Sequence, residues 1–178
     1  MASETRKEIF SWIKVIVAAV VFSYIITQFI IVHANVPTGS MLDTVPIESR
    51  IVGNRLAYLF SDPQRFDVVA FDFPDNGPEE HEIYLKRIIG LPGETLEIIE
   101  GKVYVNGATK PLEDDFIREY PESKGDGIYI VPEDCYFMMG DNRNDSHDSR
   151  FWVNKFVERK KILGKVFFTY YPEVKVIE

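Results

Sequence analysis

Residues 82–93 read EIYLKRIIGLPG, and this stretch decides the predicted fold. Its first eight residues are rich in Ile, Tyr and Leu, and a Pro-Gly pair follows, which is the pattern of a short β-strand that ends in a turn. Strand alternation places Lys86 on the same face as Tyr84 and Ile88. The stretch therefore predicts a strand whose inward face carries an amine between apolar neighbours.

The same strand signature recurs through the rest of the chain. Short β-rich runs separated by turn residues predict strands at 66–73, 95–99, 102–105, 127–131, 135–139 and 165–171. Glu100-Gly101 joins two of these runs as a hairpin. A helix is predicted only at 154–163 in this part, and residues 111–124 look like an excursion from the main sheet. Many short strands predict a mostly β domain with a closed or sandwiched sheet, whose function lies on loops and strand ends.

One long apolar run precedes the β-rich part. Residues 15–32 contain only three polar residues, and a helix of this length, at about 1.5 Å per residue, nearly crosses a hydrocarbon core of ~30 Å. The basic residues on its N-terminal side are Arg6, Lys7 and Lys14, so the positive-inside tendency favours a cytoplasmic N-terminus. The sequence predicts a cytoplasmic segment at 1–14, a single transmembrane anchor at 15–32 and an extracytoplasmic β domain at 33–178.

Two other interpretations of the apolar run stay open. A cleaved secretory signal would use the small residues around Val32-His33-Ala34, but its apolar region would be longer than the usual ~7 to 15 residues. A buried core helix would need polar residues at amphipathic spacing, which the run lacks. A membrane anchor fits the length and the composition better than either.

Composition excludes several classes of function. The chain has 178 residues with a formal net charge of -8, and an acidic domain is a poor reader of phosphates, which argues against nucleic acid binding. Cys135 is the only cysteine, so an intrachain disulfide and a CxxC metal site are both impossible. No Asp or Glu cluster has the spacing of a metal site. We expect one globular domain with no metal and no cofactor.

Two further segments carry chemistry. Residues 36–41 read VPTGSM, and even eight extended residues at about 3.5 Å each keep Ser40 within ~28 Å of the apolar run. Gly39 permits a tight turn and a close approach of a substrate backbone. Residues 140–150 read GDNRNDSHDSR and combine side chains that accept from backbone amides with two arginines that can fork onto carboxylates. Such a density of polar groups predicts a rigid loop.

Ser40 and Lys86 together suggest a nucleophile and its base. A lysine on an apolar inward face loses hydration, which lowers its pKa from about 10.4 and favours the neutral amine. A neutral amine can take the proton of a serine hydroxyl and later give it to a leaving amine. Taken alone, however, Lys86 is also interpreted as an edge-strand lysine whose ammonium reaches solvent, and the Ser40 segment as a linker.

In order and spacing, the three segments behind one apolar span resemble bacterial type I signal peptidase, the leader peptidase that uses a Ser-Lys dyad. The resemblance covers nearly the whole chain. It implies that Ser40 is the nucleophile and Lys86 the general base. It also implies that the Thr38 hydroxyl joins the Ser40 amide in the oxyanion hole.

Further positions follow from the same resemblance. Ser146 matches the serine that orients the lysine, and Asp148 and Arg150 match the ion pair that holds its loop. The residues that would line shallow pockets for the substrate are Val36, Pro37, Met41, Val45, Tyr84 and Leu85. The implied fold is mostly β with antiparallel sheets, related to the self-cleaving domain of LexA-type repressors, with one N-terminal transmembrane helix.

The resemblance also implies a substrate and a location. The family removes signal peptides from secretory preproteins by cutting after Ala-x-Ala-like sites, so we expect preproteins and membrane lipid as partners, and no nucleic acid. The catalytic domain is expected on the extracytoplasmic side of the cell membrane. Asp43 stands where the family usually has Pro, and Phe66 where it usually has Gly. These departures put the local backbone in doubt and leave the reacting groups in place. The sequence makes no prediction of the oligomeric state.

Three rival functions compete with this interpretation. A Ser-His-Asp enzyme could use His147 and Asp148, because a triad is recognised by geometry and not by order. An inactive, membrane-tethered module could grip signal peptides without cutting them. A self-cleaving regulator would need a DNA-binding helical domain, which the sequence lacks. All reacting residues of the Ser-Lys dyad are present, which favours the peptidase.

Overall fold

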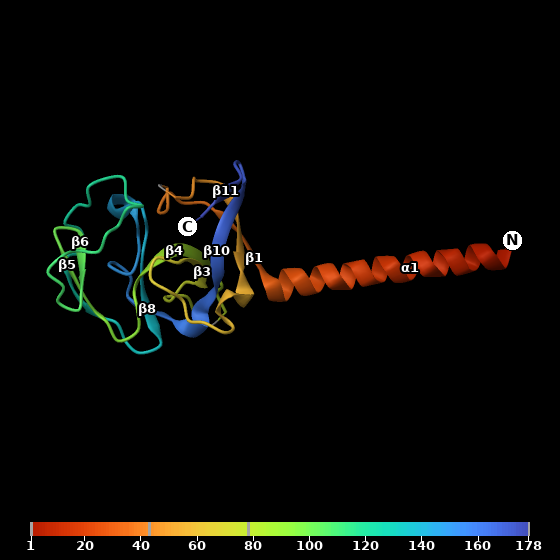
Figure 1. Cartoon of the computed structure of the whole chain (residues 1–178), viewed down its shortest axis with the longest axis horizontal. Helices are drawn as coiled ribbons and strands as arrows, with labels where there is room; N and C mark the ends of the chain where they lie inside the picture. The colour runs from red at the N-terminus through yellow and green to blue at the C-terminus, as the bar shows by residue number, and fades with distance from the viewer. Residues whose placement is uncertain (1, 43, 78, 178) are drawn as a thin grey trace.

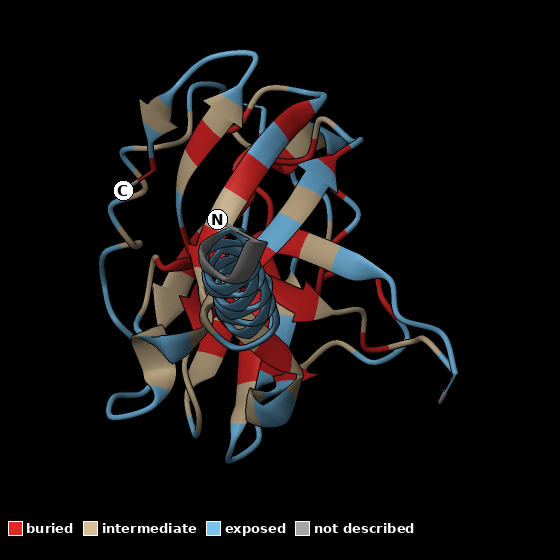
Figure 2. Ribbon diagram, turned by 90° about the vertical axis from the view of Figure 1, so that its right-hand side faces the viewer, coloured by how far each residue is buried: buried red, intermediate tan, exposed pale blue. Residues whose placement is uncertain are grey.

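The computed structural model describes residues 2–42, 44–77 and 79–177, with side chains from residue 5 onward. Helix α1 (Ala2–Ile25) continues as a short π-helix, η1 (Ile26–Ile30), and passes directly into strand β1 (Ile31–Val36). Figure 1 shows this helical segment projecting from one side of the β domain. Figure 2 looks at it from its N-terminal end, and residues 5–25 are all exposed.

The projecting segment has the properties of a membrane span. Among the described residues, Thr5–Ile30 is the one helix that is long and apolar enough to cross a membrane. Its 26 residues, at about 1.5 Å each, exceed a ~30 Å hydrocarbon core. The helix ends at Ile30, two residues before the predicted end of the anchor, because Val32 is buried in β1 and pairs with Gly53.

In the part of the chain that the structure describes, eight strands form the main sheet, and all their pairings are antiparallel. The strand order is β1-β2-β10-β3-β4-β8-β9, and β11 pairs with β10. The strands after β1 are β2 (Ser49–Asn54), β3 (Val68–Asp72), β4 (Ile83–Gly90), β8 (Cys135–Met139), β9 (Val157–Glu158), β10 (Ile162–Tyr171) and β11 (Lys175–Val176). The short 3-10 helices are η2 (Arg55–Tyr58), η3 (Arg143–Asp145) and η4 (Arg159–Lys161). Strand β4, which carries Lys86, therefore lies inside the sheet between β3 and β8.

A second sheet, of three strands within the described ranges, lies at the end of the molecule opposite α1 (Figure 1). It consists of β5 (Thr95–Ile99), β6 (Lys102–Val105) and β7 (Gly127–Ile130). The predicted hairpin is confirmed, because Glu100 and Gly101 have φ angles of 49° and 73°, as a two-residue I′ turn requires. Residues 106–126, all of them described, form no helix or strand, in agreement with the predicted excursion.

Buried side chains hold β4 from both faces. Within the described residues they form three clusters, represented by Val32, Ile51 and Ala70, by Phe71, Ile88 and Trp152, and by Ile89, Leu96 and Phe137. Burial of each large apolar side chain contributes about 1.5 to 3 kcal/mol. The strand that carries the predicted base is thus part of a rigid frame.

The helix predicted at 154–163 is wrong. Val157 is fully buried and pairs with Tyr136 as part of β9, and Ile162 pairs with Phe71 as the first residue of β10. Only the short turn η4 between these strands is helical. Pairing with distant strands overrides the local helical preference of this segment. Strands β1 and β2 were not predicted.

The two departures from the family pattern have different outcomes. Asp43 lies outside the described residues. Phe66 keeps the backbone that a glycine adopts easily, with a φ of 73°, and its amide donates to the carbonyl of Ile88 at 2.8 Å. The left-handed backbone conformation destabilises a residue that has a side chain by about 1 to 2 kcal/mol. The contact of its ring with the edge of Phe116, at a centroid distance of 5.4 Å, offsets part of that cost.

Candidate active site

Ser40 lies on a tight turn that follows β1. The turn is closed by hydrogen bonds from the Leu42 amide to the Gly39 carbonyl, at 3.0 Å, and from the Val45 amide to the Met41 carbonyl, at 2.6 Å. Ser40 itself is buried. The interpretation of this segment as a plain linker is therefore wrong, because the chain folds back to hold one serine inside the domain.

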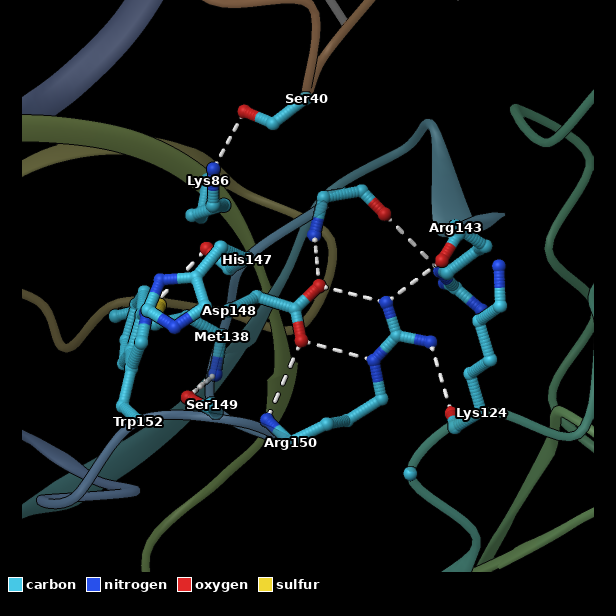
Figure 3. Close-up of polar contacts among 12 residues, drawn as sticks. Ser40, Lys86, Lys124, Met138, Arg143, His147, Asp148, Ser149, Arg150 and Trp152 are labelled. Carbon is cyan, nitrogen blue, oxygen red and sulfur yellow. Dashed lines mark hydrogen bonds and ion pairs between the residues drawn. The ribbon is translucent and has the colours of Figure 1, made fainter. Parts of the chain in front are cut away.

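Lys86 reaches this serine from the interior of the main sheet. Its Nζ donates a hydrogen bond to the Ser40 Oγ at 2.5 Å (Figure 3). Only 3% of Lys86 is exposed, since β4 has a neighbouring strand on each side. The alternative of an edge-strand lysine that reaches solvent is wrong.

The surroundings of Lys86 favour the neutral amine. Burial lowers the pKa of the Lys86 amine from 10.5 to about 8, because the ammonium loses its hydration. The carboxylates of Asp148 and Asp141 act in the opposite direction, and the Arg150 guanidinium acts in the same direction as burial. At pH 7 about a tenth of the molecules then carry the neutral form. This form can accept the proton of the Ser40 hydroxyl.

Thr38 lies beside Ser40, the predicted nucleophile. Its Oγ1 is 3.4 Å from the Ser40 Oγ, two residues away on the same turn. The structure therefore brings together Thr38, Ser40 and Lys86. The predicted part of the Thr38 hydroxyl in an oxyanion hole stays a prediction.

A cavity of about 300 Å³ opens beside the dyad. Of the predicted substrate residues, Val36, Pro37, Tyr84 and Leu85 line it. Met41 and Val45 do not, because both are fully buried in a core cluster. Gly39, which the sequence predicted to admit a substrate backbone, also lines it. Sequence reasoning did not assign the other lining residues to substrate contact, namely Ala34, Asn35, Ile51, Ala70, Glu82, Ile83, Asp145 and His147. The small side chains among them leave room for a substrate backbone.

Asp148 and Arg150 anchor the loop that follows β8. Two hydrogen bonds of 2.8 Å join the Arg150 guanidinium to both carboxylate oxygens of Asp148, and the two side chains are almost completely buried (Figure 3). Asp148 also accepts from the Gly140 amide at 3.1 Å. Removing one partner of such a buried pair typically costs about 3 to 5 kcal/mol, so the pair fixes residues 140–150 as a unit.

Ser146 lies where this loop meets the nucleophile. Both its Oγ and the carbonyl oxygen of Ser40 are packed against the α-carbon of Gly140, so a β-carbon there would overlap both. The Ser146 hydroxyl is buried, and it finds no hydrogen-bond partner among the described residues. Its predicted role in orienting Lys86 stays a prediction.

A second buried ion pair flanks the dyad. Arg87, the residue after Lys86, donates to both carboxylate oxygens of Asp141, at 2.9 and 2.7 Å. Thr44 donates to the same carboxylate. Sequence reasoning did not assign this pair, although both residues lie in the quoted segments, because their separation of 54 positions gives no local signal.

The Ser-His-Asp alternative does not fit this geometry. The carboxylate of Asp148 is occupied by Arg150 and the Gly140 amide. His147 is exposed at the cavity wall, and its ring stacks on Phe151 at a centroid distance of 6.5 Å. Among the described residues, the basic side chain that is hydrogen-bonded to the Ser40 hydroxyl is Lys86 and not His147.

Known proteins are similar to this chain in sequence. A family model described as "Signal peptidase, peptidase S26" matches residues 9–171. The chain belongs to this family. A probable signal peptidase I-2 of Synechocystis sp. is 37% identical over 165 residues, which cover 92% of this chain and 73% of that protein. Signal peptidase I S of Bacillus subtilis (strain 168) is 35% identical over 177 residues, which cover 94% of this chain and 91% of that protein.

A solved structure also matches. The crystal structure of a signal peptidase I from Enterococcus faecalis V583 covers 59% of this chain and 97% of its own, with 33% sequence identity and a TM-score of 0.47. Family membership and the named relatives make this chain a serine peptidase. They do not favour the inactive binding module.

Proposed function

We propose that this chain removes signal peptides from secretory preproteins, cutting after Ala-x-Ala-like sites with Ser40 as nucleophile and Lys86 as general base. The hydrogen bond of 2.5 Å between the buried Lys86 amine and the Ser40 hydroxyl carries the proposal. The relatives named signal peptidase I support the substrate class.

The proposed mechanism uses one amine twice. Neutral Lys86 accepts the proton of the Ser40 hydroxyl as the Oγ attacks the scissile carbonyl carbon. The Thr38 hydroxyl and the Ser40 amide stabilise the oxyanion that forms. The Lys86 ammonium then gives its proton to the leaving amine, and the same amine activates the water that hydrolyses the acyl-enzyme.

The cavity supports a preference for small side chains in an extended substrate. Ala34 and Ala70 belong to strands that line it, and Val36, Tyr84 and Leu85 narrow it. A substrate residue with a short side chain fits between these walls, whereas a large one would displace strands held in the core. Val36, Pro37, Tyr84 and Leu85 are the residues we assign to substrate contact.

The anchor supports a place at the membrane. We assign residues 1–14 to the cytoplasm, the apolar run at 15–32 to the bilayer and the β domain to the extracytoplasmic side, because Arg6, Lys7 and Lys14 precede that run. An apolar signal peptide would enter the same bilayer, so the anchor and the proposed substrate would share one location.

Incubation of the full-length chain, in detergent micelles, with a preprotein that bears Ala-x-Ala tests the proposal. We expect a new N-terminus directly after that site. Ser40→Ala and Lys86→Ala should each lower kcat at least a thousandfold while the chain stays folded. The control is Lys160→Ala, a lysine whose side chain is 76% exposed, which should keep full activity. Cleavage that survives Ser40→Ala would refute the assignment.

A further inference from the structure

Residues 106–126 contain the predicted excursion at 111–124, and from here on we call the whole segment 106–126 the excursion. It packs against residues 140–150, the loop that contributes to the active site. This segment leaves the small sheet after β6 and returns to it at β7. The backbone amide of Glu122 donates to the Asn144 side chain at 2.8 Å, and Asn144 donates to the carbonyl of Tyr120 at 3.1 Å. Arg150 donates to the carbonyl of Lys124 at 3.3 Å. The excursion thus meets the catalytic loop at several points along its length.

Asp114 makes the strongest of these contacts. Its carboxylate accepts a hydrogen bond of 2.7 Å from the guanidinium of Arg143, and the side-chain exposures are 13% for Asp114 and 1% for Arg143. The pKa of the Asp114 carboxyl is raised, because burial outweighs the opposing effect of Arg143. Without Asp114, the Arg143 guanidinium would keep its charge in the interior and lose its ion-pair partner, which is a strongly unfavourable state.

Phe116 extends the contact to the arginine that follows Lys86 in the chain. The guanidinium of Arg87 lies 4.1 Å from the centroid of its ring, and the guanidinium of Arg143 lies 5.8 Å from it. Such cation-π contacts become stronger when the groups are removed from water. One ring of the excursion therefore contacts both the arginine next to Lys86 and an arginine of the catalytic loop.

A short series of hydrogen bonds leads from Asp114 to the nucleophile. Arg143, which Asp114 holds, donates from its Nε to the Gly140 carbonyl at 3.2 Å. Asn142 lies on the same loop, between Gly140 and Arg143. Its backbone amide donates to the Ser40 carbonyl at 3.1 Å, and its side chain donates to the Gly39 carbonyl at 3.0 Å. The position of the Ser40 turn thus depends on residues 140–143, which depend in turn on the excursion.

We propose that the excursion is a clamp that sets the position of Ser40 relative to Lys86, and that Asp114 is its main positioning residue. The proposal rests on the dyad assigned above. Asp114 touches neither the substrate cavity nor the reacting atoms. Its effect should therefore fall on the catalytic step, which requires a precise distance between nucleophile and base, and not on substrate affinity.

Asp114→Asn in the full-length chain tests the clamp, with Asp115→Asn as the matched control. Asp115 is the exposed neighbour, so the control makes the same change of charge. We expect Asp114→Asn to lower kcat on a preprotein about tenfold, with KM unchanged within about twofold. Asp115→Asn should match the wild type, and Asp114→Glu, which keeps the carboxylate, should recover most of kcat.

Amide hydrogen exchange separates the clamp from the proposed function, because it needs no turnover. Segment 140–146, which contains the Asn142 amide, should exchange about tenfold faster in Asp114→Asn and at the wild-type rate in Asp115→Asn. Wild-type chain that fails to cut preproteins would refute the function and leave this comparison valid.

Two results would overturn the clamp. One is a folded Asp114→Asn variant with wild-type kcat, and the other is unchanged exchange over 140–146 despite a loss of kcat. If Asp114→Asn does not fold, Phe116→Leu decides the matter, because it removes the ring beside Arg87 and keeps an apolar side chain. Wild-type kcat in that variant would overturn the proposal.

Discussion

The lowered pKa of the Lys86 amine suits its proposed role as general base, and it carries a cost in stability. A pKa lowered from 10.5 to about 8 corresponds to about 3 kcal/mol against the charged form. Because the folded pKa lies below the unfolded value, the penalty is complete below pH 8 and is relieved as pH rises from about 8 to 10.5. The packing of β4 between two strands keeps this unfavourable group in place.

The same pKa fixes the pH dependence of activity. Since only the neutral amine accepts the serine proton, kcat/KM should rise about tenfold per pH unit up to about pH 8 and then level off. Initial rates on a preprotein from pH 5.5 to 10, at constant ionic strength, measure this profile. Circular dichroism over the same range controls for acid unfolding. A flat profile in the folded protein would exclude Lys86 as the base.

Among the elements of the fold, the junction of β8 with the catalytic loop leaves the least room. Gly140 follows the last residue of β8, and its α-carbon separates the Ser40 carbonyl from the Ser146 hydroxyl. Ser146 can rotate about one bond, but the carbonyl of Ser40 belongs to the backbone. Any side chain at Gly140 must therefore move the turn that carries the nucleophile.

Gly140→Ala should consequently damage catalysis. We expect a loss of about 1 to 3 kcal/mol in unfolding free energy, as for other overpacked sites, and at least a tenfold lower kcat. Gly77→Ala is the control, because a β-carbon there meets no atom within 4 Å. Denaturant unfolding and preprotein cleavage measure the two effects. Wild-type kcat in Gly140→Ala would show that the turn tolerates displacement.

The sequence predicted well those elements whose conformation is determined by residues close together in the chain. The hairpin at Glu100-Gly101 follows from residues that tolerate positive φ, and its two strands have the predicted bounds. The helix prediction for residues 154–163 failed because Val157 pairs with Tyr136 of another strand. Local propensity contains no information about a partner that far away in the sequence. The ion pair of Asp114 with Arg143 was not predicted for the same reason, since the two residues are 29 positions apart in the sequence.

The candidate site followed the same rule in part. The contact between Ser40 and Lys86 was predicted from the family resemblance. The two residues are 46 positions apart, and no periodic pattern in the sequence indicates that they meet. The placement of Met41 and Val45 in the core could not be read from the turn, because burial of these side chains depends on strands that enter much later. Features that depend on long-range packing were therefore missed, unless the family resemblance supplied them.

At the scale of the whole molecule, the anchor and the active site are joined with no flexible linker. The helix ends at Ile30, β1 begins at Ile31, and Ser40 follows four residues after the end of β1. A six-residue strand spans about 20 Å, so Ser40 lies a short distance along the chain from Ile30, the C-terminal end of the helical segment. Figure 1 shows β1 directly continuing that segment. A signal peptide held in the same bilayer would present its cleavage site at comparable depth.

Deleting α1, Ala2–Ile25, should therefore impair the reaction at the membrane and spare the chemistry. The β domain keeps its buried clusters, which include no residue of α1, so kcat/KM on a short water-soluble peptide should stay within about twofold of the full chain. Processing of a preprotein inserted in lipid vesicles should fall at least tenfold, because the anchor raises the effective concentration of the enzyme at its substrate. Parallel assays on the two substrates measure the difference. Equal processing in vesicles by both forms would show that the anchor has no positioning role, whereas loss of activity on both substrates would show that α1 supports the dyad itself.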